Sequence, residues 1–279
     1  MHLPNLITIL LLLANSAFSQ EYKGTISDSL TNETLPYVNI GIVGKNNGTV
    51  SDQNGHFNIS LDKSYDLDTI KFSIIGYESK SSLVKDFKSN HKEMDFKLLL
   101  STKITVLREV IVKPDDNKSL VLGNTPQSRF FSFGFEINNL GNEIGSLFKI
   151  PHSIIFIDSI QLNISKCNYD SLFLRLNVYK VNGNRMDNIL TEPIYLNLTK
   201  KEAKRGPVID LSKYAIFVDD DFLISVELVK YLGEKGFYFY ARSPSEQYPV
   251  LYRGASQGDW KYVYRNLKTA GISILAYIH

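Results

Sequence analysis

The chain has 279 residues but only one cysteine, Cys167, and only one tryptophan. A single cysteine excludes a disulfide within the chain, and the strand-like pattern beside Cys167 predicts a packed thiol rather than a reactive one. No segment after the first 19 residues is long and apolar enough to span a bilayer as a helix. We therefore predict no transmembrane span once those 19 residues are removed.

An excess of one charge is also lacking, since 31 Lys and Arg residues stand against 29 Asp and Glu residues, for a formal net charge of +2. This balance gives no electrostatic reason to expect nucleic acid or a strongly anionic membrane as a partner. Helical periodicity is almost absent as well, which disfavours a helical fold.

Catalytic motifs are missing. The histidines of the mature chain do not form His-Glu-x-x-His, and there is no Gly-x-Ser-x-Gly turn. We therefore predict no peptidase activity, no cofactor and no enzyme. A glycoside hydrolase needs only two carboxylates that are distant in sequence, so a small glycan-acting hydrolase stays open as an alternative.

Two acidic segments raise the question of calcium, namely Asp52-x-Asn54-Gly55 and Asp219–Asp221. Neither continues as the ligand pattern that fills six or seven oxygen positions. For the first we predict an Asx turn, and for the second a run of solvated charges that leads into a strand. The sequence therefore predicts no metal site.

Residues 1–19 have the pattern of a secretory signal peptide. An apolar run from Leu6 to Leu13 is followed by the small residues Ala17 and Ser19, as signal peptidase cleavage requires. The run is shorter than the roughly 20 residues that span a bilayer. We expect cleavage and export.

Apolar residues recur at every second position through most of the remaining chain, for example at Phe57, Ile59 and Leu61 and again from Leu172 to Val178. This period is typical of half-buried strands. We predict an all-β protein with a small prealbumin-like or immunoglobulin-like sandwich over residues 20–112. A polar linker over 113–128 then leads into a jelly-roll-like sandwich over 129–279.

Five short motifs mark the first domain. They are Gly24-Thr-Ile-x-Asp28, Leu35-Pro-Tyr-Val-Asn-Ile40, Gly48-Thr-Val-Ser-Asp52, Asn54-Gly-His-Phe57 and Ile74-Ile-Gly-Tyr77. Over residues 20 to 100 the chain resembles the carboxypeptidase regulatory-like domain that precedes many exported and TonB-associated proteins of Bacteroidetes. The resemblance implies a non-catalytic accessory β-module, commonly found at the periplasmic end of TonB-dependent outer-membrane receptors. The C-terminal domain is not assigned to a family.

Aromatic residues gather in the last third of the chain. Within Phe237–Tyr240 one face must point into the core, but rings near polar side chains also suit sugars, whose C–H faces stack on aromatic planes. We predict ligand binding by Trp260, Tyr252, Arg253 and Asp259, with Trp260 in an exposed loop.

The sequence thus predicts an exported, non-catalytic binding protein of the cell envelope, located in the periplasm, at the outer membrane or at the cell surface. Its expected partner is a glycan or an envelope protein of a TonB-dependent receptor system. A structural or assembly partner of such a system, using an exposed sheet edge or apolar patch, is the second hypothesis.

Overall fold

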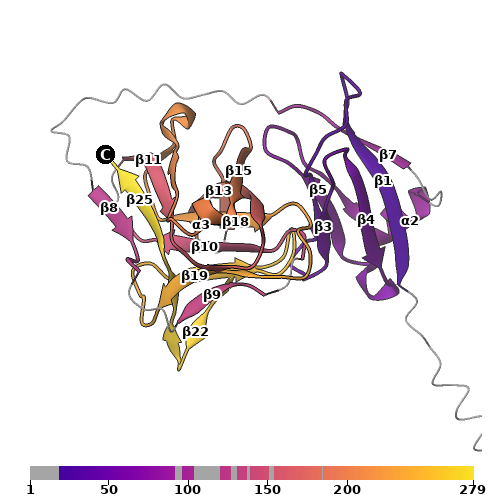
Figure 1. Cartoon of the computed structure of the whole chain (residues 1–279). Helices are drawn as coiled ribbons and strands as arrows, with labels where there is room; N and C mark the ends of the chain where they lie inside the picture. Colours follow the sequence, from indigo (N-terminus) through magenta and orange to yellow (C-terminus); the bar gives the residue numbers. More distant parts are fainter. Residues whose placement is uncertain are drawn as a thin grey trace, which may run out of the picture.

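A computed structural model describes residues 19–91, 96–103, 120–126, 131–136, 139–150, 154–183 and 185–279. Two β-sandwiches lie side by side (Figure 1), so the predicted all-β fold is confirmed. Residues 1–18 of the predicted signal peptide lie outside the described residues, as do positions 113–119 and 127–128 of the predicted linker. Among the described residues, no helix is long and apolar enough to cross a membrane.

The N-terminal sandwich packs a sheet of order β4-β1-β7 against a sheet of order β3-β2-β5-β6. Strand β1 pairs in antiparallel fashion with β4 and in parallel with β7. The apolar residues of the two sheets form one core, which helix α2 joins through Phe87. The element bounds are β1 Gln20–Asp28, β2 Asn39–Ile42, β3 Gly48–Val50, β4 His56–Leu61, η1 Lys63–Tyr65, β5 Thr69–Ser73, β6 Lys80–Leu83, α2 Val84–Asn90 and β7 Phe96–Leu100.

The turn before β4 is the predicted Asx turn. The carboxylate of Asp52 accepts hydrogen bonds from the backbone N–H groups of Asn54, at 2.8 Å, and His56, at 2.9 Å. Gly55 has a φ of +77°, a conformation that glycine adopts without a steric penalty. The hydrogen bonds of this turn therefore account for the presence of a carboxylate at Asp52.

The C-terminal sandwich has one large sheet of order β14-β13-β18-β10-β20-β21, to which β15 is added by pairing with β13. Its opposite layer consists of β16-β11-β25-β8, with β17 on β11, and of β12-β19-β24, with β9 on β19. The main core lies between these layers. The strands are β8 Leu120–Gly123, β9 Ser132–Phe135, β10 Glu143–Phe148, β11 Ile155–Leu162, β12 Ile164–Cys167, β13 Ser171–Asn182, β14 Arg185–Asn188, β15 Ile194–Thr199, β16 Val208–Asp210, β17 Phe217–Val218, β18 Phe222–Leu228, β19 Phe237–Arg242, β20 Val250–Arg253, β21 Lys261–Tyr262, β22 Tyr264–Arg265, β23 Lys268–Thr269, β24 Gly271–Ile272 and β25 Ile274–Ile278; the helices are α3 Lys200–Ala203 and η2 Ser212–Tyr214.

The prediction of a linker over 113–128 is wrong for residues 120–124. Strand β8 pairs with β25 of the C-terminal sandwich, and the side-chain amide of the buried Asn124 donates to the carbonyl oxygens of Tyr248 and Ile272. A Cβ at Gly123 would lie 2.2 Å from the carbonyl oxygen of Ile274, so only glycine fits this close pairing. The polar residues on either side favoured a linker, whereas the apolar Leu120–Leu122 form a strand because β25 supplies its partner.

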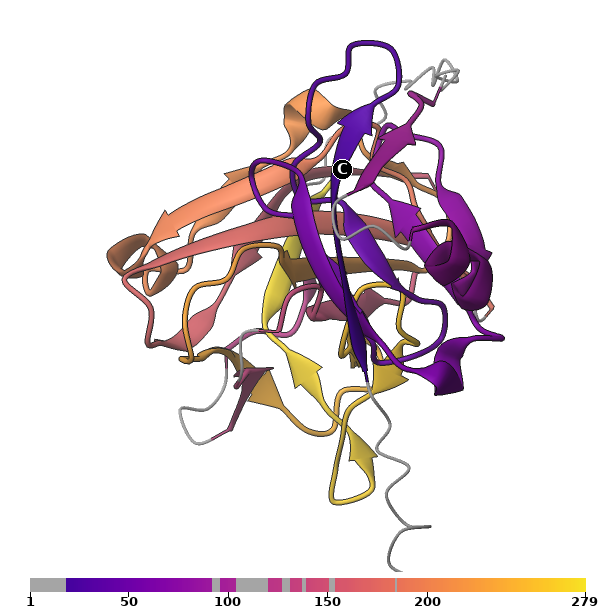
Figure 2. The same ribbon diagram turned by 90° about the vertical axis from the view of Figure 1, so that its right-hand side faces the viewer.

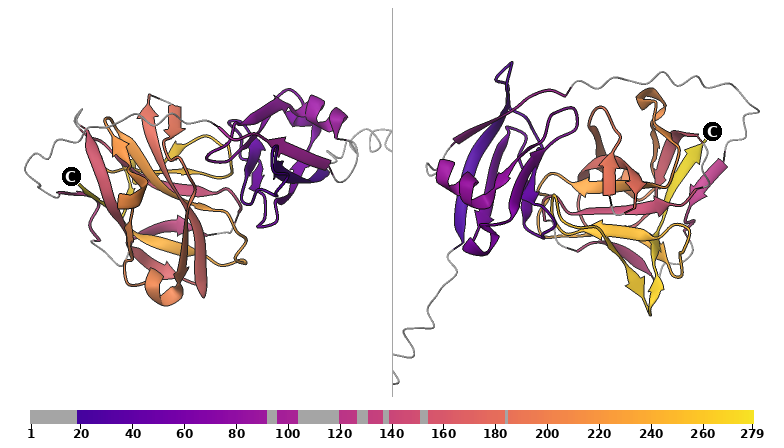
Figure 3. Two further views of the ribbon diagram at one scale, coloured as in Figure 1. Left: turned by 90° about the horizontal axis from the view of Figure 1, so that it is seen from above. Right: turned by 180° about the vertical axis from the view of Figure 1, so that it is seen from behind.

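Other predictions about the core are confirmed. Phe237 and Phe239 are fully buried whereas Tyr238 and Tyr240 on the other face of β19 are partly exposed, and Cys167 is buried. Strand β18 departs from the expected half-burial, because all seven of its residues are buried. Its second face is covered in part by a small apolar cluster around Leu223 that includes Trp260, and in part by the N-terminal sandwich, which lies against the large sheet in Figures 2 and 3.

Candidate functional site: a polar seam and an aromatic groove

A row of four charged side chains crosses the outer face of the large sheet. Arg175 on β13 is directly opposite Glu227 on β18, Glu227 is opposite Glu143 on β10, and Glu143 is opposite Arg253 on β20. Directly opposite residues of antiparallel strands project on the same face. The register therefore sets two carboxylates side by side with one arginine at each end.

Each carboxylate has its own arginine. The Nη2 atom of Arg175 lies 2.8 Å from Oε2 of Glu227, and Nε of Arg253 lies 2.8 Å from Oε2 of Glu143. Glu143 and Glu227 are 0 % exposed, and the side chain of Arg253 is 10 % exposed. The side-chain amide of Asn177 donates to both carboxylates, at 2.8 and 3.0 Å. These contacts offset the repulsion between the two buried negative charges.

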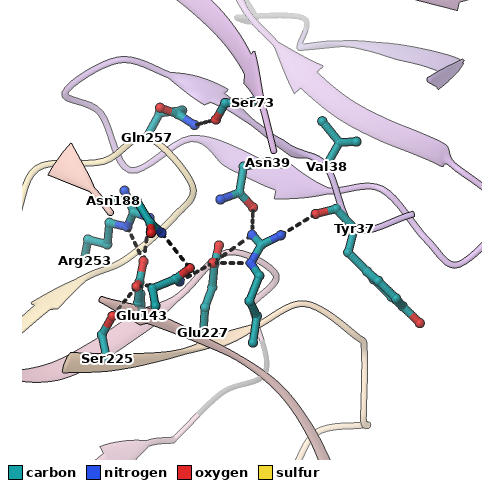
Figure 4. A network of polar contacts seen from close by, with 12 residues as sticks. Tyr37, Val38, Asn39, Ser73, Glu143, Asn188, Ser225, Glu227, Arg253 and Gln257 are labelled. Carbon is teal, nitrogen blue, oxygen red and sulfur yellow. Dashed lines mark hydrogen bonds and ion pairs between the residues drawn. The ribbon is translucent and has the colours of Figure 1, made fainter. Parts of the chain in front are cut away.

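The row reaches into the N-terminal domain (Figure 4). Arg175 Nη1 donates to the carbonyl oxygen of Tyr37 at 2.7 Å, and Nη2 donates to Oδ1 of Asn39. The ring of Tyr37 packs against the rings of Phe173 and Tyr195, with centroids 5.2 and 5.3 Å apart. We call this contact between the two domains the seam.

A loop of the C-terminal domain completes the seam. The carbonyl oxygen of Ser256 would lie only 2.0 Å from a Cβ at Gly41 and 2.6 Å from one at Gly48. These two glycines are paired with each other on β2 and β3, so their missing side chains let the two backbones meet. Gln257 Nε2 donates to Ser73 Oγ at 2.7 Å, and this bond also joins the two domains.

Two groups beside the buried carboxylates, Arg253 and Tyr179, have raised pKa values. Burial is the largest effect and lowers the pKa of Arg253, but the combined interactions with Glu143, Tyr179 and Glu227 outweigh it, so the pKa is raised. Burial, followed by the negative charge of Glu143, raises the pKa of Tyr179 well above its ordinary value. The arginine therefore stays charged and the phenol stays neutral at ordinary pH.

An aromatic groove of about 580 Å³ opens on the C-terminal sandwich, where β9 and β19 of one layer meet β10 and β20 of the other. Rings and polar side chains share its walls. The aromatic lining residues are Phe133, Phe135, Tyr238, Tyr252, Tyr262 and Tyr264, and the amide and charged lining residues are Glu136, Asn139, Asn142 and Arg253.

Several groove side chains are available to a ligand. Tyr264 is 62 % exposed and Tyr262 is also exposed, while Tyr252 packs edge-on against Phe133 with centroids 6.2 Å apart. Asn142 Oδ1 is buried and has no hydrogen-bond partner in the part of the chain that the structure describes. The groove thus offers exposed rings to a ligand, whereas the Asn142 acceptor is itself covered.

The four predicted ligand-binding residues divide between these two places. Tyr252 and Arg253 line the groove. Trp260 lies over the seam side of the sheet, where its ring meets Tyr179 edge-on at 5.7 Å and the Arg253 guanidinium at 5.0 Å. Asp259 is exposed beside Gly44 of the N-terminal domain. The loop of Trp260 is therefore packed in part against the other domain, whereas we had expected it to be exposed.

Sequence reasoning missed the charged row. Its signal is the presence of Arg175, Asn177 and Glu227 at the polar positions of strands whose alternate residues are strongly apolar. Among the described residues, no group of three His, Cys, Asp or Glu side chains is placed to hold a metal ion.

Fold and site together define a two-domain β-sandwich protein in which a small N-terminal domain packs against a larger domain that carries a groove. Comparison with known families gives the N-terminal domain its identity: residues 22–112 match the CarboxypepD_reg-like domain, and the chain contains that domain. The match ends before the C-terminal sandwich. A search of curated proteins found no match to the chain.

Proposed function

We propose that this chain is an exported, non-catalytic binding protein of the cell envelope and that its C-terminal domain binds a glycan in the aromatic groove. The observation that supports this function best is the combination of exposed tyrosines with amide and carboxylate side chains around one cavity. Sugar rings offer C–H faces to aromatic planes and hydroxyl groups to polar side chains. A volume of about 580 Å³ is within the usual range of small-molecule pockets.

The arrangement of the buried carboxylates supports binding without hydrolysis. A glycoside hydrolase needs two carboxyl groups that reach the scissile bond. Glu143 and Glu227 are adjacent, but both are fully buried, each is held by an arginine, and neither lines the groove. A substrate in the groove does not meet this pair.

The CarboxypepD_reg-like domain serves in this proposal as a fixed spacer. The Arg175 bonds to Tyr37 and Asn39 hold it against the large sheet. Because the two domains are fixed to each other, the groove keeps a constant orientation relative to any structure that anchors the N-terminal domain. Export would be tested by fractionating cells that produce the full chain or a form without residues 2–19; recovery of both forms in the cytoplasm would contradict it.

The alternative, an assembly partner of a TonB-dependent system, has one observation in its favour. Strand β8 forms the edge of its sheet, and its residues Leu120 and Val121 are 57 % and 53 % exposed. An exposed edge with apolar side chains is a surface on which another strand can pair. Binding of a purified receptor that is abolished by Val121→Lys, with glycan binding absent, would favour this alternative.

A glycan-array screen followed by calorimetric titration of the best hit tests the glycan proposal. We expect Tyr264→Ala to weaken binding by about tenfold, equal to about 1.4 kcal/mol, because it removes an exposed ring of the groove. Tyr231→Ala is the matched control, since Tyr231 is 59 % exposed and lies outside the groove. Absence of any hit, or equal affinity of Tyr264→Ala and the unaltered chain, would contradict glycan binding in the groove.

A further inference from the structure

A second cavity, of about 640 Å³, lies along the seam and is lined by both domains. We call it the interdomain cleft. The N-terminal domain contributes β5 and the segment that follows it, and the C-terminal domain contributes β13, β14 and β20. A ligand in this cleft would touch both domains at once.

Cationic side chains dominate the charge of the interdomain cleft. Five of them line it, but Asp187 is the only carboxylate among its described lining residues. Three of the five already have a carboxylate partner, as Arg185 pairs with Asp187 at 2.7 Å and the two arginines of the row pair with the buried glutamates. The five cationic residues are Lys71, Lys103, Arg175, Arg185 and Arg253.

Of the two lysines that line the cleft, Lys103 is exposed, whereas Lys71 is partly buried and has no direct carboxylate partner among the described residues. Lys71 lies on β5, and it makes no ion pair or side-chain hydrogen bond within the described ranges. Burial lowers its pKa, and the positive charges of Arg253 and Arg185 lower it further, while the Asp187 carboxylate opposes this only in part. Burying an ammonium group among other cations costs free energy unless an anion compensates it.

We propose that the interdomain cleft binds a ligand through an oxyanion, either a carboxylate or a sulfate or phosphate group, which Lys71 contacts together with Arg185. The cavity is larger than a single oxyanion needs, so the ligand carries this group on a larger body. Because the walls belong to both domains, the bound ligand stabilises the seam. Arg253 lines both this cleft and the aromatic groove, but neither Lys71 nor Arg185 lines the groove.

Titration of the full chain with sodium sulfate in a calorimeter, against sodium chloride of equal ionic strength, tests the proposal. We expect saturable binding of sulfate and a rise in the thermal midpoint at millimolar sulfate. Lys71→Gln is expected to weaken sulfate binding by about tenfold or more, since it removes a direct charged contact to the anion. In sulfate-free buffer the same variant is expected to be at least as stable as the unaltered chain, because an uncompensated cation has been removed.

Lys97→Gln is the matched control, because Lys97 is exposed on β7 in the opposite sheet of the same domain. Sulfate also stabilises proteins generally by exclusion from their surfaces, and that effect raises the midpoint of both variants equally. No saturable heat, or an unchanged affinity in Lys71→Gln, would overturn the proposal.

Two further arms identify the source of the anion and separate this site from the groove. Titration with glucuronate and with inorganic phosphate distinguishes a carboxylate ligand from a tetrahedral one. Tyr264→Ala is expected to leave the sulfate affinity unchanged; a loss of that affinity would place the anion in the groove and contradict a site at Lys71.

Discussion

The two faces of the large C-terminal sheet come from the same strands but form different interfaces. On β13, Leu174, Leu176 and Val178 face the core of the sandwich, whereas Arg175 and Asn177 between them face the other domain. The apolar face is stabilised in proportion to the apolar area that it removes from water. This non-directional stabilisation tolerates small shifts of the packed side chains. The polar face needs each donor opposite its acceptor, and it therefore specifies one orientation of the N-terminal domain.

The charged row is better understood as a device for specificity than as a source of stability. Buried ion pairs often contribute no more than a hydrophobic replacement of equal volume, because both charges lose their hydration. Breaking one partner is costly, however. We infer that the row favours this docking of the two domains, since another docking would deprive the buried Arg175 guanidinium of its acceptors on Tyr37 and Asn39.

The largest effect is expected from breaking this row at one end. Arg175→Met should lower the free energy of unfolding by about 3–5 kcal/mol, because it leaves the Glu227 carboxylate buried and uncompensated. Chemical denaturation measures this change. Lys180→Met is the control, since its ion pair with Asp219 is exposed and should contribute about 1 kcal/mol or less.

A double variant sharpens the comparison. Arg175→Met combined with Glu227→Leu should recover much of the loss, because both charges are then absent and their volume is kept. Additive losses in the double variant would show that Arg175 and Glu227 stabilise the fold independently.

On the opposite face, Leu176→Ala should lower the free energy of unfolding by about 2–5 kcal/mol through lost burial and the cavity that remains. Unlike Arg175→Met, this variant should leave the seam closed, so the sulfate titration should give an unchanged affinity. A loss of sulfate binding in Leu176→Ala would mean that the two faces are coupled.

Gly41→Ala tests the close approach of the two domains. The new Cβ would meet the carbonyl oxygen of Ser256 at 2.0 Å, so the hairpin or the loop must move, at a cost of about 1–3 kcal/mol. Ser60→Ala, at an exposed position of β4, is the control. Equal denaturation midpoints for the two variants would argue against this contact.

The smallest effect concerns Asp28, away from the seam. Hydrogen bonds from the backbone N–H groups of Thr31 and Leu30, followed by one from the Tyr77 hydroxyl, lower the pKa of its carboxyl group. Its stabilisation is therefore present above the unfolded pKa of about 3.9 and is lost as the pH falls through the lower folded value. Asp28→Asn should reduce the loss of stability below pH 4, measured by urea denaturation; an unchanged pH profile would contradict this account.

The sequence predicted those features that are local. Alternation gave the buried faces of β4 and β19, and Asp52-x-Asn54-Gly55 gave its turn, because side-chain period and turn chemistry act over a few residues. The pairing of Glu143 with Glu227 and their arginines depends on the register of four strands that are distant in sequence. The same limit applies to β8, which forms a strand because β25 lies beside it, and to Tyr252 and Tyr264, which meet only in the folded groove.

Labelling of carboxylates in the native full chain tests the closed seam most directly. With a water-soluble carbodiimide and an amine, followed by peptide mass spectrometry, Glu143 and Glu227 should remain unmodified while the exposed Glu192 and Glu234 are labelled rapidly. Labelling of Glu143 and Glu227 at the rate of those two exposed residues would show that the outer face is open to water and would contradict the docking of the two domains.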